Sequence, residues 1–105
     1  MYAIHLSEAS EENWEGMPFL TLLPPEIGGQ VEIYQLTVNH RNLHLHEAEN
    51  QIYFLQSGRG IMEIGNEKKE VGPGSTVYIP CGELHALTPL DGEPIVLLSI
   101  KHSLT

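Results

Sequence analysis

Short apolar segments alternate with turn residues along the whole chain. Successive side chains of a β-strand point to opposite faces, and in segments such as 31–38 apolar residues fall on both faces, which indicates strands buried on both sides. Glycine and proline separate the segments, for example at positions 24–25, 28–29 and 72–74. We predict strands over residues 2–6, 17–23, 31–38, 51–55, 61–64, 68–71, 76–79, 84–87 and 95–100. This many short strands indicates an all-β fold, either a sandwich or a closed barrel.

The segment that follows the first predicted strand is not apolar. Residues 7–16 are polar and acidic, and Trp14 is their one large apolar side chain. Ser7 or Ser10 could begin one helical turn as its N-cap, and a plain loop is the alternative. We expect Trp14 to cover the side of the core or to form part of an interface.

Length and composition limit the classes of function. A chain of 105 residues has room for one core, so we expect a single domain over residues 1–105. The formal net charge of −9 argues against nucleic acid as a partner, because its phosphates would be repelled. No apolar run approaches the roughly 20 residues of a membrane span, and the chain does not begin with a basic and then apolar signal segment. With Cys81 as its one cysteine, we expect a cytoplasmic protein that does not bind membranes.

The spacing of the histidines indicates metal chemistry. His44 and His46 are separated by one residue, so on a strand both imidazoles point to the same face. Two imidazoles aimed at one point form half of a transition-metal site. A third histidine, His85, follows the turn residues Pro80 and Gly82, and we expect it to supply the other half.

Two spaced motifs resemble those of the cupin superfamily. The first, over residues 44–58, has a His-x-His pair and a closing glycine, and the second, over residues 74–85, has a Gly, a Pro-x-Gly and a final His. The positions that match are His44, His46, Gly58, Gly74, Pro80, Gly82 and His85. The resemblance implies a small single-domain jelly-roll barrel, the double-stranded β-helix.

The resemblance also implies a metal site inside the barrel. There His44, His46, residue 51 and His85 would converge on one divalent ion. Imidazole binds Fe, Mn, Ni, Cu and Zn, so the residue types leave the identity of the metal open. The alternative is a metal-free barrel in which the histidines only bind the ligand or one of them acts as a general base.

Residue 51 departs from the family pattern, because Gln51 stands where Glu is usual. An amide oxygen is a weaker and uncharged ligand, so a bound metal would keep its full charge and attract an anionic or enolate substrate more readily. Its affinity for the site would be lower. Glu49 shares a strand face with Gln51 and could supply the missing carboxylate, and Glu47 is a second alternative.

Four residues near the motifs are candidates for lining the pocket. His40 lies on the face of His44 and His46 if the strand is continuous, and an exposed turn position is the alternative. Glu49 and Tyr53 share the face of Gln51. Tyr78 shares the face of Pro80, and for both tyrosines core packing is the alternative to pocket lining.

The resemblance implies chemistry on a small organic molecule, either as a metal-dependent dioxygenase or as an isomerase or lyase. The alternative is a non-catalytic module that binds or senses a sugar or another metabolite. Small cupins commonly pair, so the resemblance also implies a homodimer. The apolar stretch 17–23, with Trp14 beside it, could furnish the interface.

Overall fold

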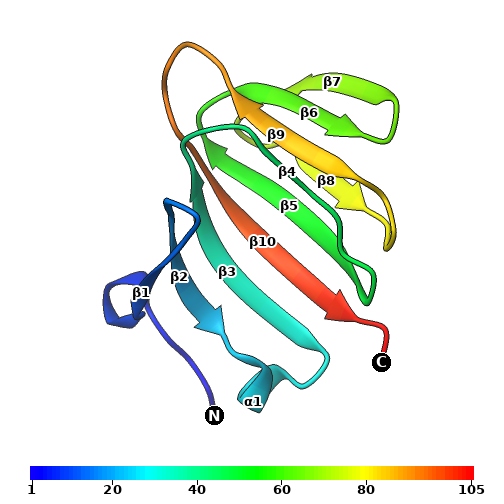
Figure 1. The fold of residues 1–105 in the computed structure, drawn as a ribbon. Helices are drawn as coiled ribbons and strands as arrows, with labels where there is room; N and C mark the ends of the chain where they lie inside the picture. The colour runs from blue at the N-terminus through cyan, green and yellow to red at the C-terminus, as the bar shows by residue number, and fades with distance from the viewer.

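The computed structural model describes residues 1–105 and consists mainly of β-strands, which confirms the all-β prediction (Figure 1). The helical elements are a 3-10 turn, Leu6–Glu8, and a four-residue helix, α1 (Pro25–Gly28). Neither has the length or apolar character that crossing a bilayer requires. The strands are β1 (Glu11–Trp14), β2 (Met17–Leu23), β3 (Val31–Val38), β4 (Asn42–His44), β5 (Glu49–Ser57), β6 (Gly60–Ile64), β7 (Glu67–Val71), β8 (Thr76–Ile79), β9 (His85–Pro89) and β10 (Ile95–Ser103).

The strands form two antiparallel sheets that face each other (Figure 1). The larger sheet has the order β1-β2-β3-β10-β5-β8, and the smaller has the order β4-β9-β6-β7. The chain passes repeatedly from one sheet to the other, so strands that are distant in sequence become neighbours. The long central strand β10 pairs with β3 on one side and with β5 on the other.

The space between the sheets changes character along the strands. Towards one end, the inward side chains are apolar and fully buried, as at Leu55 on β5 and at Ile95 and Leu97 on β10. Towards the other end, the inward positions of the same two strands are polar, as at Gln51 and Ser99, which are also buried. One end of the sandwich is therefore a packed core, and the other is equipped to bind a polar group.

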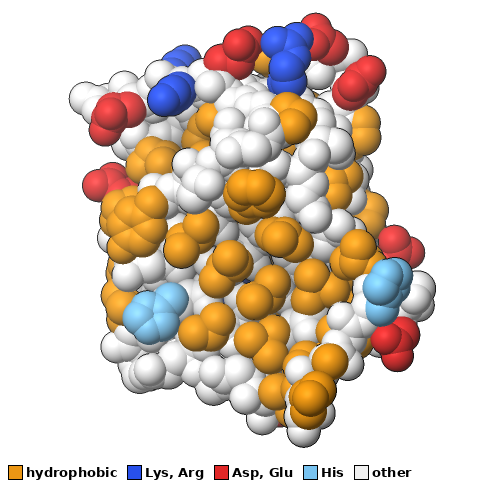
Figure 2. Space-filling view, turned by 180° about the vertical axis from the view of Figure 1, so that it is seen from behind, with side chains coloured by type: hydrophobic (Ala, Val, Ile, Leu, Met, Phe, Trp, Pro, Cys, Tyr) orange, Lys and Arg blue, Asp and Glu red, His pale blue; other side chains and the backbone are white.

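The outer face of the larger sheet is also apolar. Ile33, Ile100 and Ile52 are register neighbours across β3, β10 and β5, and Leu98 and Phe54 are neighbours one pleat further along. Alternation turns these side chains away from the core. Figure 2 shows the molecule from behind and looks onto this face, with hydrophobic side chains across its middle and charged side chains at its margins.

Eight of the nine predicted strands are confirmed, and the prediction for residues 2–6 is wrong. Residues 1–5 form no strand, and residues 6–8 form the 3-10 turn instead. The His5 side chain accepts a hydrogen bond from the backbone N–H of Ser7, and the Glu8 carboxylate accepts one from the backbone N–H of His5. These local bonds compete with strand pairing, which alternation alone does not reveal.

The strand β1 was not predicted, because its exposed sequence has no alternation. It forms a hairpin with β2 in which Trp14 pairs with Met17 across a two-residue turn. Glu15 and Gly16 both have positive φ, +50° and +83°, as a type I′ hairpin turn requires. Asn13 supports the turn by accepting a hydrogen bond from the N–H of Gly16.

Candidate metal centre

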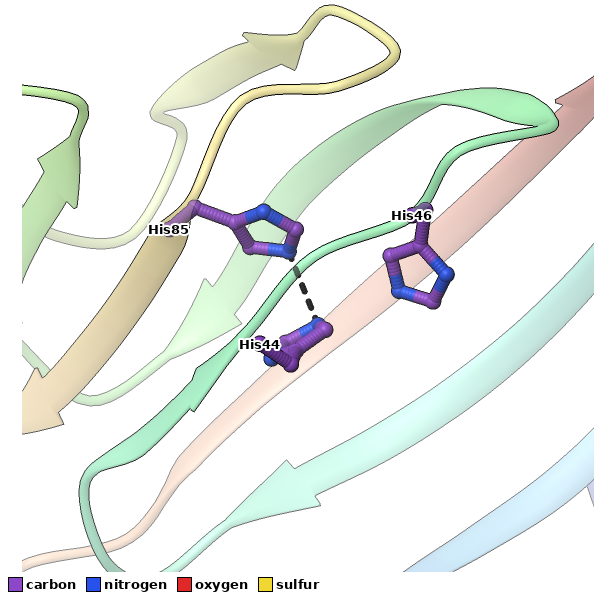
Figure 3. Close-up of side chains that lie close together, drawn as sticks. All are labelled: His44, His46 and His85. Atoms are coloured by element: carbon purple, nitrogen blue, oxygen red, sulfur yellow. Dashed lines mark hydrogen bonds between the residues drawn. The ribbon is translucent and has the colours of Figure 1, made fainter.

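Three histidines from two distant parts of the chain meet between the sheets (Figure 3). His44 ends β4, and His85 begins β9, its register partner in the smaller sheet. Directly opposed residues of an antiparallel pair have adjacent Cβ atoms. The two Nε2 atoms are consequently only 2.8 Å apart. The closest ring nitrogens of His44, His46 and His85 all lie within 4.8 Å of one another.

His46 does not lie on the strand that its spacing predicted, because β4 ends at His44. The turn before His85 holds it instead. The N–H of Gly82 donates to the carbonyl of His46 at 2.8 Å, and the Cys81 thiol donates to the carbonyl of Glu47. Gly82 has φ +84°, a conformation that favours glycine. The second motif thus positions a histidine of the first.

Each of the three imidazoles is oriented by an oxygen at its Nδ1 atom. The carbonyls of Asn42 and Glu83 accept from His44 and His85, at 3.3 and 3.0 Å, and the Glu49 carboxylate lies 2.9 Å from Nδ1 of His46. A carbonyl oxygen can only accept, so the proton of each of these rings resides on Nδ1. The lone pairs are then on Nε2. Figure 3 shows the rings turned towards a common space.

Electrostatics keep the three rings neutral. Burial lowers the pKa of His44 to about 4, with a further contribution from the nearby His85. Burial also lowers the pKa of His85 and of His46, although the Glu49 carboxylate opposes the shift at His46. At neutral pH each ring therefore carries a single proton, and none has the positive charge that would repel a cation.

Two buried acceptors at this place lack a partner, Nε2 of His46 and Oε1 of Gln51. Unpaired buried polar atoms cost free energy. The Nε2 atoms of His44 and His85 lie 2.8 Å apart, and in each ring Nδ1 already faces a carbonyl oxygen. A divalent cation would give the three imidazoles a common partner, and imidazole nitrogen with amide oxygen is a donor set that first-row metals accept. The residues present fit the metal that the resemblance implied.

A cavity of about 370 Å³ opens beside the histidines. Tyr53 lines it as predicted, and burial raises the pKa of its hydroxyl above the usual range, so Tyr53 stays protonated at neutral pH. The residues lining the cavity are Glu12, Asn13, Trp14, Phe19, Tyr34, Leu36, His44, His46, Gln51, Tyr53, Ser99 and Lys101.

Three other candidates do not line the cavity. His40 is exposed, and its Nδ1 lies 2.6 Å from the Asn39 side chain. Tyr78 is 57% exposed on the edge strand β8, because its register partner Ile52 turns outward. Glu49 contacts the Nδ1 atom of His46, so its carboxylate orients a proposed ligand and does not take the position of one.

Several residues of the cavity were not predicted from the sequence. Trp14 lines it, and its ring meets the His44 ring edge to face, with centroids 5.3 Å apart. In the stretch 17–23, Met17 is buried and Phe19 faces the cavity. Lys101 lies directly across from Gln51 on β10. Alternation along β10 places Lys101 on the same face as Ser99, but the sequence of β10 alone does not reveal that this face is the inward one.

Comparison with known proteins supports the family resemblance. The cupin domain family matches residues 36–101, more than half of the chain. An uncharacterized protein of Methanocaldococcus jannaschii is 39% identical over 60 residues, which are 57% of this chain and 48% of that protein. The chain spans about half the length of the curated relatives it matches.

Solved structures share the fold. A predicted oxalate decarboxylase of Thermotoga maritima superposes with a TM-score of 0.87 at 18% identity, covering 98% of this chain and all of the other. Ectoine synthase of P. lautus gives a TM-score of 0.87 at 16% identity, covering 98% of this chain and 78% of the other. At these identities the likeness shows the jelly-roll fold and nothing of the substrate.

Proposed function

Because this chain belongs to the cupin domain family, we propose that it binds one divalent transition-metal ion through His44, His46 and His85 and acts on a small organic molecule in the adjoining cavity. The observation that carries the proposal is the convergence of three imidazoles, each of which has an oxygen at Nδ1 and so directs Nε2 towards the shared space. A metal held there would supply Lewis acidity and open coordination positions for a ligand.

The surrounding residues have separate roles in this proposal. Gln51 would offer Oε1 as a fourth, neutral donor. Glu49 holds the His46 ring and increases the basicity of its Nε2 atom through the charge-assisted bond to Nδ1. Tyr53 keeps its proton and can donate a hydrogen bond to an oxygen of the bound molecule. The donor set accepts Fe, Mn, Ni, Cu or Zn.

The absence of an anionic ligand determines the reaction class that we favour. Three imidazoles and an amide leave the charge of the cation uncompensated, which favours binding of an enolate or another oxygen anion. We therefore favour an isomerase or lyase acting on a small carbonyl or hydroxy compound. With Fe(II) the same open positions would suit a dioxygenase.

Binding without turnover is the second candidate. It is favoured by the engagement of Glu49 with His46, which leaves that carboxylate unavailable as a general base. The cavity would then serve a sensor or carrier of a small metabolite.

Metal binding is tested by elemental analysis and by calorimetric titration with Zn(II), Ni(II) and Mn(II). We expect about one equivalent in the unmodified protein and loss of stoichiometric binding in His85→Ala. His102→Ala is the matched control, because His102 is exposed and alternation along β10 places it on the face opposite to Lys101, outside the cavity. Full metal occupancy in His85→Ala would show that the assignment is wrong.

Turnover is tested on the metal-loaded protein with a panel of small diketones, phenols, thiols and hydroxy acids. Proton NMR detects isomerisation or elimination, and oxygen uptake after Fe(II) loading detects dioxygenase activity. We expect product formation that His85→Ala abolishes. Saturable binding without any product would establish the second candidate.

We also propose that the protein is a homodimer that pairs through the outer face of the larger sheet. The outward-facing side chains at the centre of that sheet carry no charge, whereas the chain as a whole is strongly acidic. Two copies can therefore meet there without opposing carboxylates. Light scattering should give twice the chain mass, and Leu98→Glu should give a monomer. Ser103→Glu, beside the chain end, is the control for added charge. A monomeric unmodified protein would refute the pairing.

A further inference from the structure

We propose that the cavity takes a small planar monocarboxylate, with its carboxylate at Lys101 and its flat body against the aromatic wall. This inference rests on the proposed function, because it names the ligand class of the same cavity.

Lys101 supplies the positive charge. It is the one lysine or arginine that lines the cavity, and its register partner on β5 is Gln51. A ligand oxygen bound beside Gln51 would therefore lie next to the ammonium group, because directly opposed side chains on one face of a sheet are neighbours.

The ammonium group of Lys101 is available to a ligand. Its Nζ forms a long ion pair with Oε1 of Glu49, at 4.0 Å and without a hydrogen bond, and lies 5.4 Å from the centre of the Tyr34 ring. The same Oε1 atom already accepts from His46 at 2.9 Å. Glu32, the register partner of Lys101 on β3, is engaged by the Tyr34 hydroxyl. Lys101 thus keeps donors free for a carboxylate.

Aromatic side chains form the wall of the cavity. Phe19 and Tyr34 meet edge to face with ring centroids 5.6 Å apart, and Trp14 stands at the mouth against His44. Fixed rings in these orientations present edges and faces to a flat ligand, which aromatic contacts favour. A volume of about 370 Å³ is near the lower end of small-molecule pockets, so the body should be one or two rings in size.

Glu12 limits the total charge of the ligand. It lines the cavity from the edge strand β1, three strand positions from β10 in the sheet order. Through Phe19 and Leu36 its register neighbour on β10 is Leu97, so Glu12 is offset from Lys101 by roughly 14 Å across the strands and roughly 13 Å along them. A second carboxylate reaching towards the mouth would approach Glu12, so the site selects a monoanion.

Calorimetric titrations with benzoate, benzamide and terephthalate test the proposal without knowledge of the natural ligand. We expect benzoate to bind at least about tenfold more tightly than its neutral analogue benzamide, and terephthalate to bind more weakly than benzoate. Trp14 is the one tryptophan of the chain, and its fluorescence reports binding at the mouth independently. Equal affinities for benzoate and benzamide would overturn the proposal.

Variants at residue 101 identify the source of the preference. Lys101→Met should weaken benzoate binding about tenfold and leave benzamide binding unchanged, and Lys101→Arg should retain the preference. Lys69→Met is the matched control, since Lys69 is exposed on the distant strand β7. An unchanged benzoate affinity in a folded Lys101→Met would overturn the assignment.

Repeating the titrations with EDTA-treated and Zn(II)-loaded protein separates this inference from the metal proposal. A benzoate preference that depends on Lys101 in the EDTA-treated protein supports the ligand class even if zinc does not bind. Zinc binding with no effect of Lys101→Met in either form refutes the ligand class and leaves the metal proposal intact.

Discussion

Replacing Gln51 by Glu tests whether residue 51 faces the proposed metal position. Gln51 is 3% exposed, and its Oε1 atom is buried without a partner. A carboxylate placed there has three neutral imidazoles on one side and Lys101 across the strand. Without metal, we expect Gln51→Glu to lower the free energy of unfolding by about 1–3 kcal/mol, because a charge is buried with incomplete compensation.

With metal the sign should reverse. A carboxylate ligand neutralises part of the charge of the cation, and we expect about tenfold tighter binding, which corresponds to about 1.4 kcal/mol. At a free metal concentration 100-fold above the dissociation constant of the unmodified protein, metal stabilisation should rise from about 2.7 to about 4.1 kcal/mol. Urea unfolding in EDTA and in excess Zn(II), together with calorimetric titration, measures both quantities.

The control for this experiment is Gln56→Glu, which adds the same charge at an exposed position of the same strand. It should change neither the metal affinity nor the difference between the two unfolding experiments. If Gln51→Glu leaves the metal affinity unchanged, the side chain of residue 51 does not face the ion.

Three further predictions concern the histidines and the fold. In EDTA, stability should fall by roughly 1–2 kcal/mol as the pH falls from 6.5 to 4, with allowance for the solvent that screens this half-buried ring. The cause is that the unfolded state takes up a proton that folded His44, with its pKa lowered to about 4, does not. His44→Gln should flatten this dependence in urea unfolding, and an unchanged slope would contradict the assignment. Glu49→Gln should weaken Zn(II) binding about 10- to 100-fold in calorimetry, whereas the exposed control Glu47→Gln should not, and equal affinities would refute the orienting role. Gly58→Ala should lower the free energy of unfolding by more than about 1 kcal/mol, because φ is +82° and an added Cβ would lie 2.5 Å from a carbonyl oxygen. Gly92→Ala is the control, because Gly92 also has positive φ but has open space around it, and it should lose less stability in thermal unfolding. The reverse order would disprove the steric explanation.

The positions of the three histidines follow from the sequence to a large extent. Alternation predicts that His44 and His46 share a face, and the spacing of the turn residues brings His85 towards them. The prediction was incomplete because β4 ends before His46. That ring is placed by hydrogen bonds from the turn at residues 80–84 and from Glu49, and alternation along one strand does not encode such long-range contacts.

The composition of the cavity was harder to predict. Trp14 reaches it on a strand whose side chains are all exposed, so no hydrophobic pattern marks the strand. Lys101 has the right parity on β10, but β10 is apolar on both faces over much of its length. Which face is inward becomes clear only once β3 and β5 are paired on either side. The other central strands of the larger sheet also carry apolar side chains on their outer face, so their sequences do not distinguish the inward face either.

X-ray absorption spectroscopy of the metal-loaded protein is the most direct test of the three-histidine site. We predict three imidazole nitrogens at about 2.0–2.1 Å from the ion for Zn(II), and one fewer in any His85→Ala protein that still retains metal. A stoichiometrically loaded protein whose spectrum shows one imidazole or none would contradict the site that His44, His46 and His85 form.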